Sequence, residues 1–284
     1  MTEPRFSFVP VLDHEIHLTE WGNPENEPLV MWHGLARTGR DFDELARALS
    51  DEFYVLCPDT IGRGLSSWSR NPEAEYCIEF YSGIAADLLD HYGIDRAGWV
   101  GTSMGGLIGM RMASGPMSDR LCYLVINDIG PEIPQEAIDR IVDYAGTSPE
   151  FGSVCEAEEW LRAAYAPFGP ASDAFWTRMA RTSVRRKDNG RFTTHYDPRI
   201  IVQFEASPDE LTSWDRFAQI SLPTHVIQGK SSDLLTGDIL QRMKESLPEM
   251  AVTVVEDCGH APTLSRQADI AHLRQTIHGL RAAS

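Results

Sequence analysis

The chain has 284 residues, of which 42% are hydrophobic and 24% are charged. This composition excludes a disordered or fibrous chain, and the length suits one enlarged domain that carries an insertion. Its 42 Asp and Glu residues against 25 Lys and Arg residues give a formal net charge of −17. Because such a charge repels phosphate backbones and anionic lipid surfaces, we expect no nucleic-acid partner and no membrane partner.

The cysteine content argues against disulfides and zinc. There are five cysteines, an odd number, with no Cys-x-x-Cys spacing, so neither a complete disulfide framework nor a metal site is expected. Residues 1–5 lack the basic and apolar regions of a secretory signal, and no stretch approaches about 18 uninterrupted apolar residues. We therefore predict a cytoplasmic protein that holds no metal.

The first half of the chain alternates apolar strands with amphipathic helices after a short leading hairpin over 5–10 and 15–21. Strands are expected at 29–32, 53–57, 98–100 and 121–127, and helices at 41–49, 78–91 and 104–113. Alternation of near-continuous apolar strands with helices predicts an α/β fold whose parallel sheet is covered on both faces.

From about residue 130 to 220 the pattern becomes helical, with stretches at 135–144, 157–165 and 171–181 and no convincing strand. The alternation then resumes with strands at 224–228 and 252–255 and helices at 238–246 and 266–280. We therefore predict a core built from 1–129 and 221–284, interrupted by a helical insertion over 130–220.

The strongest local signal is Gly101-Thr102-Ser103-Met104-Gly105, a Gly-x-Ser-x-Gly sequence between a predicted strand and a predicted helix. A sharp strand-to-helix turn strains its central residue and leaves no room for side chains two positions away, so glycines flank it. This context predicts that Ser103 is a nucleophile lifted above the sheet, whereas the simpler interpretation is a glycine-rich turn for close packing.

A serine nucleophile needs a base and a carboxylate that orients the base. His260 follows the last predicted strand and Asp233 follows the preceding one, so both are expected at the carboxyl edge of the sheet. The chain order Ser, Asp, His is the one typical of this arrangement. Asp128, directly after the strand at 121–127, is the alternative acid, and we prefer Asp233.

Chemistry at a carbonyl also needs donors for the oxyanion. The backbone N–H groups of Leu35 and Met104 are the candidates, because Leu35 follows an early strand and Met104 follows the nucleophile. We expect the His33 side chain to brace this loop rather than to transfer protons.

Two phosphate-binding motifs are incomplete. Gly229-Lys230-Ser231 ends like a P-loop, but Thr224 stands where the first glycine is required. Residues 101–106 carry a serine where a dinucleotide-binding motif needs its second glycine. We therefore expect no cofactor.

Together these residues resemble the α/β-hydrolase superfamily. The motifs that carry the resemblance are His33-Gly34, the Asp-x-x-Gly-x-Gly-x-Ser stretch over 59–66, the turn around Ser103, and the segments around Asp233 and His260. The resemblance implies an eight-stranded, mostly parallel sheet, a helical cap inserted after the sixth strand, and hydrolysis through an acyl-enzyme. It also implies that the stretch over 59–66 braces the oxyanion loop.

Aromatic residues in the insertion predict an apolar substrate pocket, because ligand sites are mostly apolar and often lie between domains. Trp160, Tyr165 and Trp176 are the candidates for its lining. The basic run over 185–187 is a candidate for attracting a carboxylate-bearing substrate, although such runs are more often solvated surface.

The sequence therefore predicts a serine hydrolase that cleaves a small carboxylic ester, working as a monomer or homodimer on a small-molecule ester or lactone. The alternatives are a lactonase or carbon–carbon bond hydrolase of the same fold, and a non-catalytic receptor for a small ligand that retains the triad.

Overall fold

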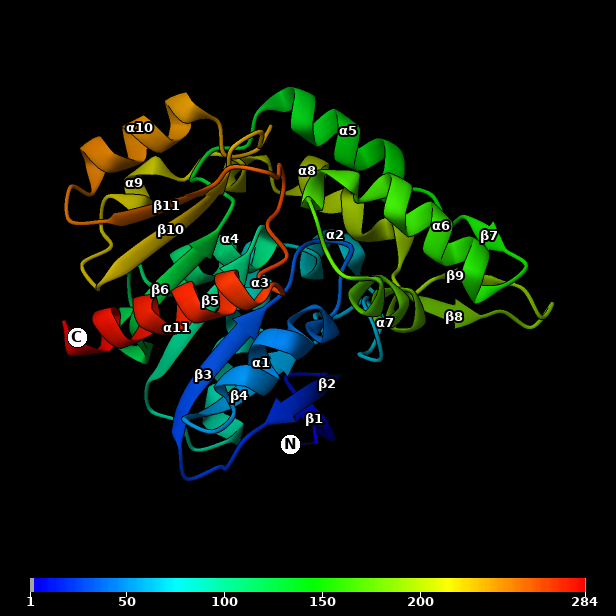
Figure 1. Cartoon of the computed structure of the whole chain (residues 1–284), viewed down its shortest axis with the longest axis horizontal. Helices are drawn as coiled ribbons and strands as arrows, with labels where there is room; N and C mark the ends of the chain where they lie inside the picture. Colours follow the sequence, from blue (N-terminus) through cyan, green and yellow to red (C-terminus); the bar gives the residue numbers. More distant parts are fainter. Residues whose placement is uncertain (1–2, 284) are drawn as a thin grey trace.

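An eight-stranded sheet with helices on both faces forms the core of the computed structural model, which describes residues 3–283 (Figure 1). The strand order is β1-β2-β4-β3-β5-β6-β10-β11. The strands β4, β3, β5, β6, β10 and β11 run parallel, whereas β2 pairs antiparallel with both β1 and β4. The predicted α/β class and its leading hairpin are confirmed. The strands are β1 Arg5–Val11, β2 His14–Trp21, β3 Glu27–Trp32, β4 Phe53–Pro58, β5 Ala97–Thr102, β6 Leu121–Asn127, β10 Thr224–Gly229 and β11 Ala251–Val255.

The parallel strands are apolar on both faces because both faces are covered. In β3, Leu29 and Met31 pack toward α1 and α11, whereas Val30 and Trp32 pack toward α3 and α4 on the opposite face. This alternation explains why the strands appear as continuous apolar runs in the sequence. The helices of this part are η1 Gly39–Phe42, α1 Asp43–Leu49, α2 Pro72–Glu75, α3 Ile78–His91, α4 Met104–Met112, η2 Ser118–Arg120, α10 Gly237–Ser246 and α11 Gln267–Ala282.

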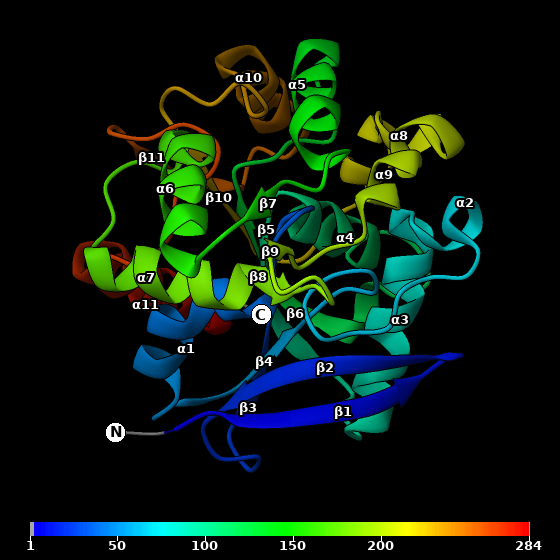
Figure 2. The same cartoon turned by 90° about the vertical axis from the view of Figure 1, so that its right-hand side faces the viewer.

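Residues 130–220, most of the segment between β6 and β10, are called the cap below. The cap elements α6, α7 and β7 to β9 lie to the right of the sheet in Figure 1 and face the viewer in Figure 2. It is mainly helical, but it also contains a three-stranded antiparallel sheet of order β7-β9-β8. The expectation of a segment without strands is therefore wrong, because strands of two or three residues are too short to display an alternating pattern. The elements of the cap are α5 Gln135–Ala145, β7 Glu150–Phe151, α6 Val154–Ala164, η3 Ala166–Phe168, α7 Asp173–Ser183, β8 Val184–Arg186, β9 Phe192–Thr194, η4 Pro198–Val202, α8 Gln203–Ala206, η5 Pro208–Glu210 and α9 Trp214–Phe217.

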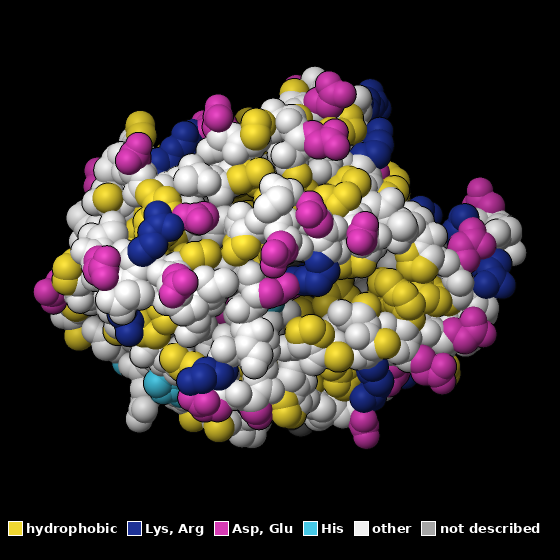
Figure 3. Space-filling model, turned by 90° about the horizontal axis from the view of Figure 1, so that it is seen from above, with side chains coloured by type: hydrophobic (Ala, Val, Ile, Leu, Met, Phe, Trp, Pro, Cys, Tyr) yellow, Lys and Arg dark blue, Asp and Glu magenta, His cyan; other side chains and the backbone are white. Residues whose placement is uncertain are grey.

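Charged side chains are spread over the surface. The face seen in Figure 3 carries Asp and Glu side chains interspersed with Lys, Arg and small apolar patches. Within residues 3–283, no helix combines the length and the apolar character that crossing a bilayer requires.

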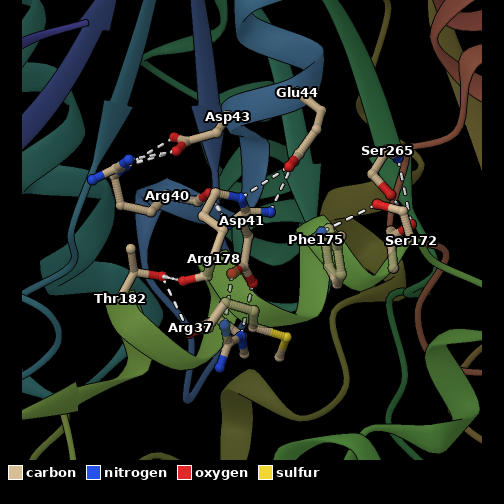
Figure 4. Close-up of polar contacts among 12 residues, drawn as sticks. Arg37, Arg40, Asp41, Asp43, Glu44, Ser172, Phe175, Arg178, Thr182 and Ser265 are labelled. Atoms are coloured by element: carbon tan, nitrogen blue, oxygen red, sulfur yellow. Dashed lines mark hydrogen bonds and ion pairs between the residues drawn. The ribbon is translucent and has the colours of Figure 1, made fainter. Parts of the chain in front are cut away.

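One guanidinium fastens the cap to the core. Arg178 on α7 donates to both carboxylate oxygens of Glu44 on α1, at 3.0 and 2.8 Å, and to the backbone oxygen of Arg40 at 2.6 Å. Figure 4 shows these contacts beside Asp43, which pairs with the Arg40 side chain. The Arg178 side chain is 15% exposed and that of Glu44 is 27% exposed. A bidentate pair with this much burial holds α7 against α1 more firmly than a surface pair would.

We expect Arg178→Gln to lower the free energy of unfolding by about 1–3 kcal/mol, because it leaves the partly buried Glu44 carboxylate without its charged partner. Urea denaturation measures this loss, and limited proteolysis reports whether cleavage within the cap accelerates. Arg181→Gln is the matched control, since Arg181 lies on the same helix but is exposed. Equal stability of the two variants would contradict the role given to Arg178.

Candidate active site

Ser103 occupies a strained turn between β5 and α4. Its φ of 52° and ψ of −115° lie outside the helical and extended regions. A Cβ atom at Gly105 would come within 2.0 Å of the backbone oxygen of Trp32, and one at Gly101 within 2.1 Å of the backbone oxygen of Gly105. There is therefore no room for a side chain at either flanking glycine, as the sequence predicts for this turn.

Ser103 and His260 form a hydrogen-bonded chain that ends on Asp128. The Ser103 Oγ lies 2.8 Å from His260 Nε2, and His260 Nδ1 lies 2.9 Å from Asp128 Oδ2. The Asp128 carboxylate can only accept, so Nδ1 carries the proton and Nε2 is free to accept the serine hydroxyl proton. The His260 side chain is 13% exposed and that of Asp128 is fully buried.

The structure does not bring Asp233 to His260; Asp128, the alternative acid of the sequence analysis, bonds to His260 in its place. Asp233 instead accepts two hydrogen bonds from Arg140 of the cap, at 2.7 and 3.0 Å, and its side chain is 49% exposed. The physical reason is strand register. Asn127 at the end of β6 pairs with Thr102 of β5, so the next residue on each strand, Asp128 and Ser103, lies at the same edge. Asp233 comes several residues after β10 ends.

Asp128 is held through both its carboxylate and its backbone. Its Oδ1 accepts the backbone N–H of Gly229 at 2.6 Å, and its own backbone N–H donates to the oxygen of Ile227 at 2.8 Å. Its φ of 61° is a conformation that aspartate tolerates better than most residues. Oδ2 is therefore fixed toward the imidazole.

The sequence analysis did not single out Asn127, which links the two halves of this site. Its Nδ2 donates to the Thr102 hydroxyl at 3.0 Å and to the backbone oxygen of Pro262 at 2.9 Å. Its backbone oxygen accepts the N–H of Ser103 at 2.9 Å. Asn127 therefore joins the turn that carries Ser103 to the loop that carries His260. Its position one residue before Asp128 was the available signal.

His33 braces the loop after β3, as predicted. Its Nδ1 donates to the backbone oxygen of Gly34 at 2.7 Å, and its Nε2 accepts the N–H of Thr60 at 2.9 Å. Burial lowers the pKa of His33 to about 4, because desolvation penalises the charged imidazolium. The ring is therefore neutral at pH 7.

The motif stretch over 59–66 supports the same loop. Asp59 accepts hydrogen bonds from the N–H groups of Gly39 at 2.8 Å and Leu65 at 3.0 Å, and from His17 Nδ1 at 2.8 Å. Burial alone would raise the pKa of Asp59, but the hydrogen bond and charge of His17 outweigh it and hold that pKa below its usual value. The bracing role implied by the resemblance is thus visible in the contacts.

Arg63 is the second residue that sequence reasoning missed. Its fully buried guanidinium donates to the backbone oxygen of Leu35 at 2.8 Å and to the Tyr81 hydroxyl at 2.8 Å, and it lies 3.5 Å from the Met104 sulfur. It therefore contacts both residues predicted to supply oxyanion donors. The available signal in the sequence was its place between Gly62 and Gly64 of the motif.

A pocket between core and cap opens on Ser103 and His260, and Leu35 forms part of its wall. Of the three predicted lining residues, Tyr165 lines this pocket, together with Tyr144, Phe168 and Phe175. Trp160 and Trp176 instead pack within the cap. Trp160 lies against Phe151 and Trp176 against Phe175, with ring centroids 5.7 and 5.4 Å apart.

The basic run over 185–187 lies away from this pocket. Arg186 covers the ring of Phe192 at 4.1 Å, and Lys187 pairs with Glu150. Within residues 3–283, no cluster of three or more His, Cys, Asp or Glu side chains is arranged to hold a metal ion.

Comparisons with known proteins match nearly the whole chain. A model described as "Alpha/beta hydrolase family" matches residues 29–273. The 3-hydroxybutyrate-oligomer hydrolase of Cupriavidus necator is 35% identical over 290 residues, which cover 97% of this chain and 98% of that protein. Esterase YbfF of Escherichia coli is 36% identical over 247 residues, 83% of this chain and 86% of that protein. The crystal structure of an alpha/beta hydrolase from Novosphingobium aromaticivorans superimposes with a TM-score of 0.83 at 29% identity, covering 98% and 99% of the two chains.

The neutral state of His33 makes stability depend on pH. In the unfolded chain His33 binds a proton below about pH 6.5, whereas in the folded protein it does so only near pH 4. Between these two pH values the unfolded state binds more protons, so the free energy of unfolding falls as the pH drops. The contribution of His33 is up to about 3 kcal/mol, and buried His225, with its pKa also lowered to about 4, acts in the same direction.

We therefore expect His33→Gln to reduce the difference in unfolding free energy between pH 7 and pH 4.5, measured by urea denaturation. Exposed His91 offers the matched control His91→Gln, which should keep the wild-type pH dependence. An unchanged slope in His33→Gln would argue against a neutral buried imidazole.

Proposed function

Because the chain belongs to the alpha/beta hydrolase family, we propose that it is a serine hydrolase of small carboxylic esters. The observation that carries this proposal is the hydrogen-bonded chain from Ser103 through His260 to Asp128, at the wall of a pocket. A serine hydroxyl is a weak nucleophile until a base removes its proton, and this chain supplies both the base and the group that orients it.

In the acylation step, Ser103 Oγ attacks the ester carbon while His260 Nε2 takes the hydroxyl proton. The tetrahedral intermediate collapses as the bond to the alcohol oxygen breaks, and His260 returns the proton to that oxygen. In deacylation, His260 removes a proton from water, whose oxygen attacks the acyl carbon. The bond from that carbon to Ser103 Oγ then breaks, and His260 returns the proton to Ser103 Oγ as the acid leaves. Asp128 keeps the imidazole in the tautomer that each step requires and stabilises the imidazolium.

The backbone N–H groups of Leu35 and Met104 are the proposed donors to the oxyanion. The contacts of Arg63 support this assignment, because its guanidinium donates to the backbone oxygen of Leu35 and contacts the Met104 sulfur. Because donors fixed in advance need not reorganise in the transition state, a rigid mount for both residues favours this assignment.

The proposed substrate class is a short oligoester of a 3-hydroxy acid. It is supported by the 3-hydroxybutyrate-oligomer hydrolase, which aligns with 97% of this chain. The pocket walls include aromatic and aliphatic side chains, which suit the methyl and methylene groups of such a chain.

Ser103→Ala removes the nucleophile, so we expect kcat for p-nitrophenyl acetate to fall by at least ~10⁴-fold. Labelling with a fluorophosphonate should disappear with it, while the circular dichroism spectrum should stay that of the wild type. Retained esterase activity in this variant would contradict the proposal. A wild-type protein that neither labels nor hydrolyses esters would favour a non-catalytic receptor.

The identity of the acid is tested by Asp128→Asn and Asp233→Asn. Asn at 128 presents an amide that cannot hold the imidazole in the required tautomer, so kcat for a neutral ester should fall by ~10³- to 10⁴-fold. Asp233→Asn should change that kcat less than about threefold, because a half-exposed ion pair contributes ~1 kcal/mol or less. The reverse ranking would restore Asp233 as the acid.

A further inference from the structure

Arg140 gives the pocket a positive charge that the proposed ester chemistry does not use. It lies on α5 of the cap and, with Ile141 and Tyr144, forms part of the wall of the pocket that holds Ser103. Its side chain is 43% exposed, so the guanidinium is at the solvent side of that wall.

The other arginine in the wall, Arg37, is already neutralised. Its Nε and one terminal nitrogen donate to the two carboxylate oxygens of Asp41, at 2.8 and 2.6 Å, and Asp41 belongs to the same wall. The pair lies near Phe175 of the cap in Figure 4. Because the Arg37 side chain is only 6% exposed, exchange of Asp41 for another anion would cost burial as well as hydrogen bonds.

Arg140 differs because its carboxylate partner stands outside the pocket wall. Asp233 binds it through two hydrogen bonds, but both side chains are close to half exposed, at 43% and 49%. Such an ion pair contributes only ~1 kcal/mol or less, so a substrate carboxylate of similar geometry competes for the same guanidinium.

The overall charge makes this local cation significant. A net charge of −17 repels an anionic substrate. A cationic group in the pocket wall attracts the anion locally and so counters this repulsion. An oligoester of a 3-hydroxy acid has one hydroxyl end and one carboxylate end, so it is such an anion.

We propose that Arg140 binds the free carboxylate on the alcohol side of the substrate, in exchange for Asp233, and thereby selects ester acids over neutral esters. The inference rests on the proposed function. In a 3-hydroxybutyrate dimer, Ser103 would take the hydroxyacyl half, while the half that leaves as the free hydroxy acid keeps its carboxylate at Arg140.

The test compares this dimer with the same dimer capped as its primary amide, which removes the charge without adding a second ester bond. The measured quantity is the acid preference, the ratio of kcat/KM for the acid to kcat/KM for the amide. We expect Arg140→Gln to lower it at least tenfold, mainly through KM for the acid, and Arg140→Lys to restore part of it. Asp233→Asn should raise it severalfold by removing the competing carboxylate.

Arg162→Gln is the matched control, because Arg162 lies on α6 of the same cap, pairs with Glu158 and Asp173, and is absent from the pocket wall. It should keep the wild-type preference. Equal losses on acid and amide in Arg140→Gln, or no change in the ratio, would overturn the inference while leaving the ester hydrolysis intact. Failure of the proposed function is distinct, since the wild type would then cleave neither dimer nor p-nitrophenyl acetate.

Discussion

The pairing of β5, β6 and β10 is the constraint on which the rest of the site depends. Asn127 is in register with Thr102 on one side and with Ile227 on the other. The residues that follow, Ser103 and Asp128, therefore leave the sheet side by side at its carboxyl edge. Only the imidazole has to be delivered from elsewhere, by the loop after β11, and Asn127 Nδ2 ties that loop down at Pro262. Strand register thus places Ser103 and Asp128, and the loop after β11 adds only His260.

The same register explains which parts of the site the sequence could predict. Ser103 was identifiable because its strained turn demands glycines at fixed spacing, and His260 because it follows the last strand. The choice between Asp233 and Asp128 was not decidable from pattern, because both carboxylates follow strands of one sheet and preserve the same chain order. It depends on how far each turn carries its side chain from the edge. Asn127 and Arg63 act through contacts of a buried amide and a buried guanidinium, which produce no hydrophobic periodicity in the sequence. The strands β7 to β9 are too short to show an alternating pattern.

A group of buried polar side chains holds the loop over 33–39 in place at the carboxyl edge of the sheet. His33, Asp59 and Arg63 each bind backbone groups of the loop over 33–39. Neither His33 nor Asp59 is suited to exchange protons with a substrate, because burial lowers the pKa of His33 to about 4 and the contacts of Asp59 hold its pKa below the usual value. Buried polar groups are costly unless fully bonded, so their presence here favours a site where exact donor placement matters more than stability.

Two of the contacts between cap and core, one on α7 and one on α5, differ in burial, and the difference bears on how the pocket recognises a ligand. At α7, Arg178 is mostly buried and binds both Glu44 and the Arg40 backbone, which fixes that side of the cap. At α5, the contact between Arg140 and Asp233 is exposed to water and is correspondingly weak. An anion that enters the pocket therefore meets a fixed wall on one side and an exchangeable cation on the other. A carboxylate that takes the place of Asp233 accepts the two hydrogen bonds that Arg140 otherwise donates to Asp233, so Arg140 keeps two acceptors, while the Asp233 carboxylate is left to water. Under the proposed function, charge recognition at Arg140 and ester cleavage at Ser103 thus use different residues of one pocket.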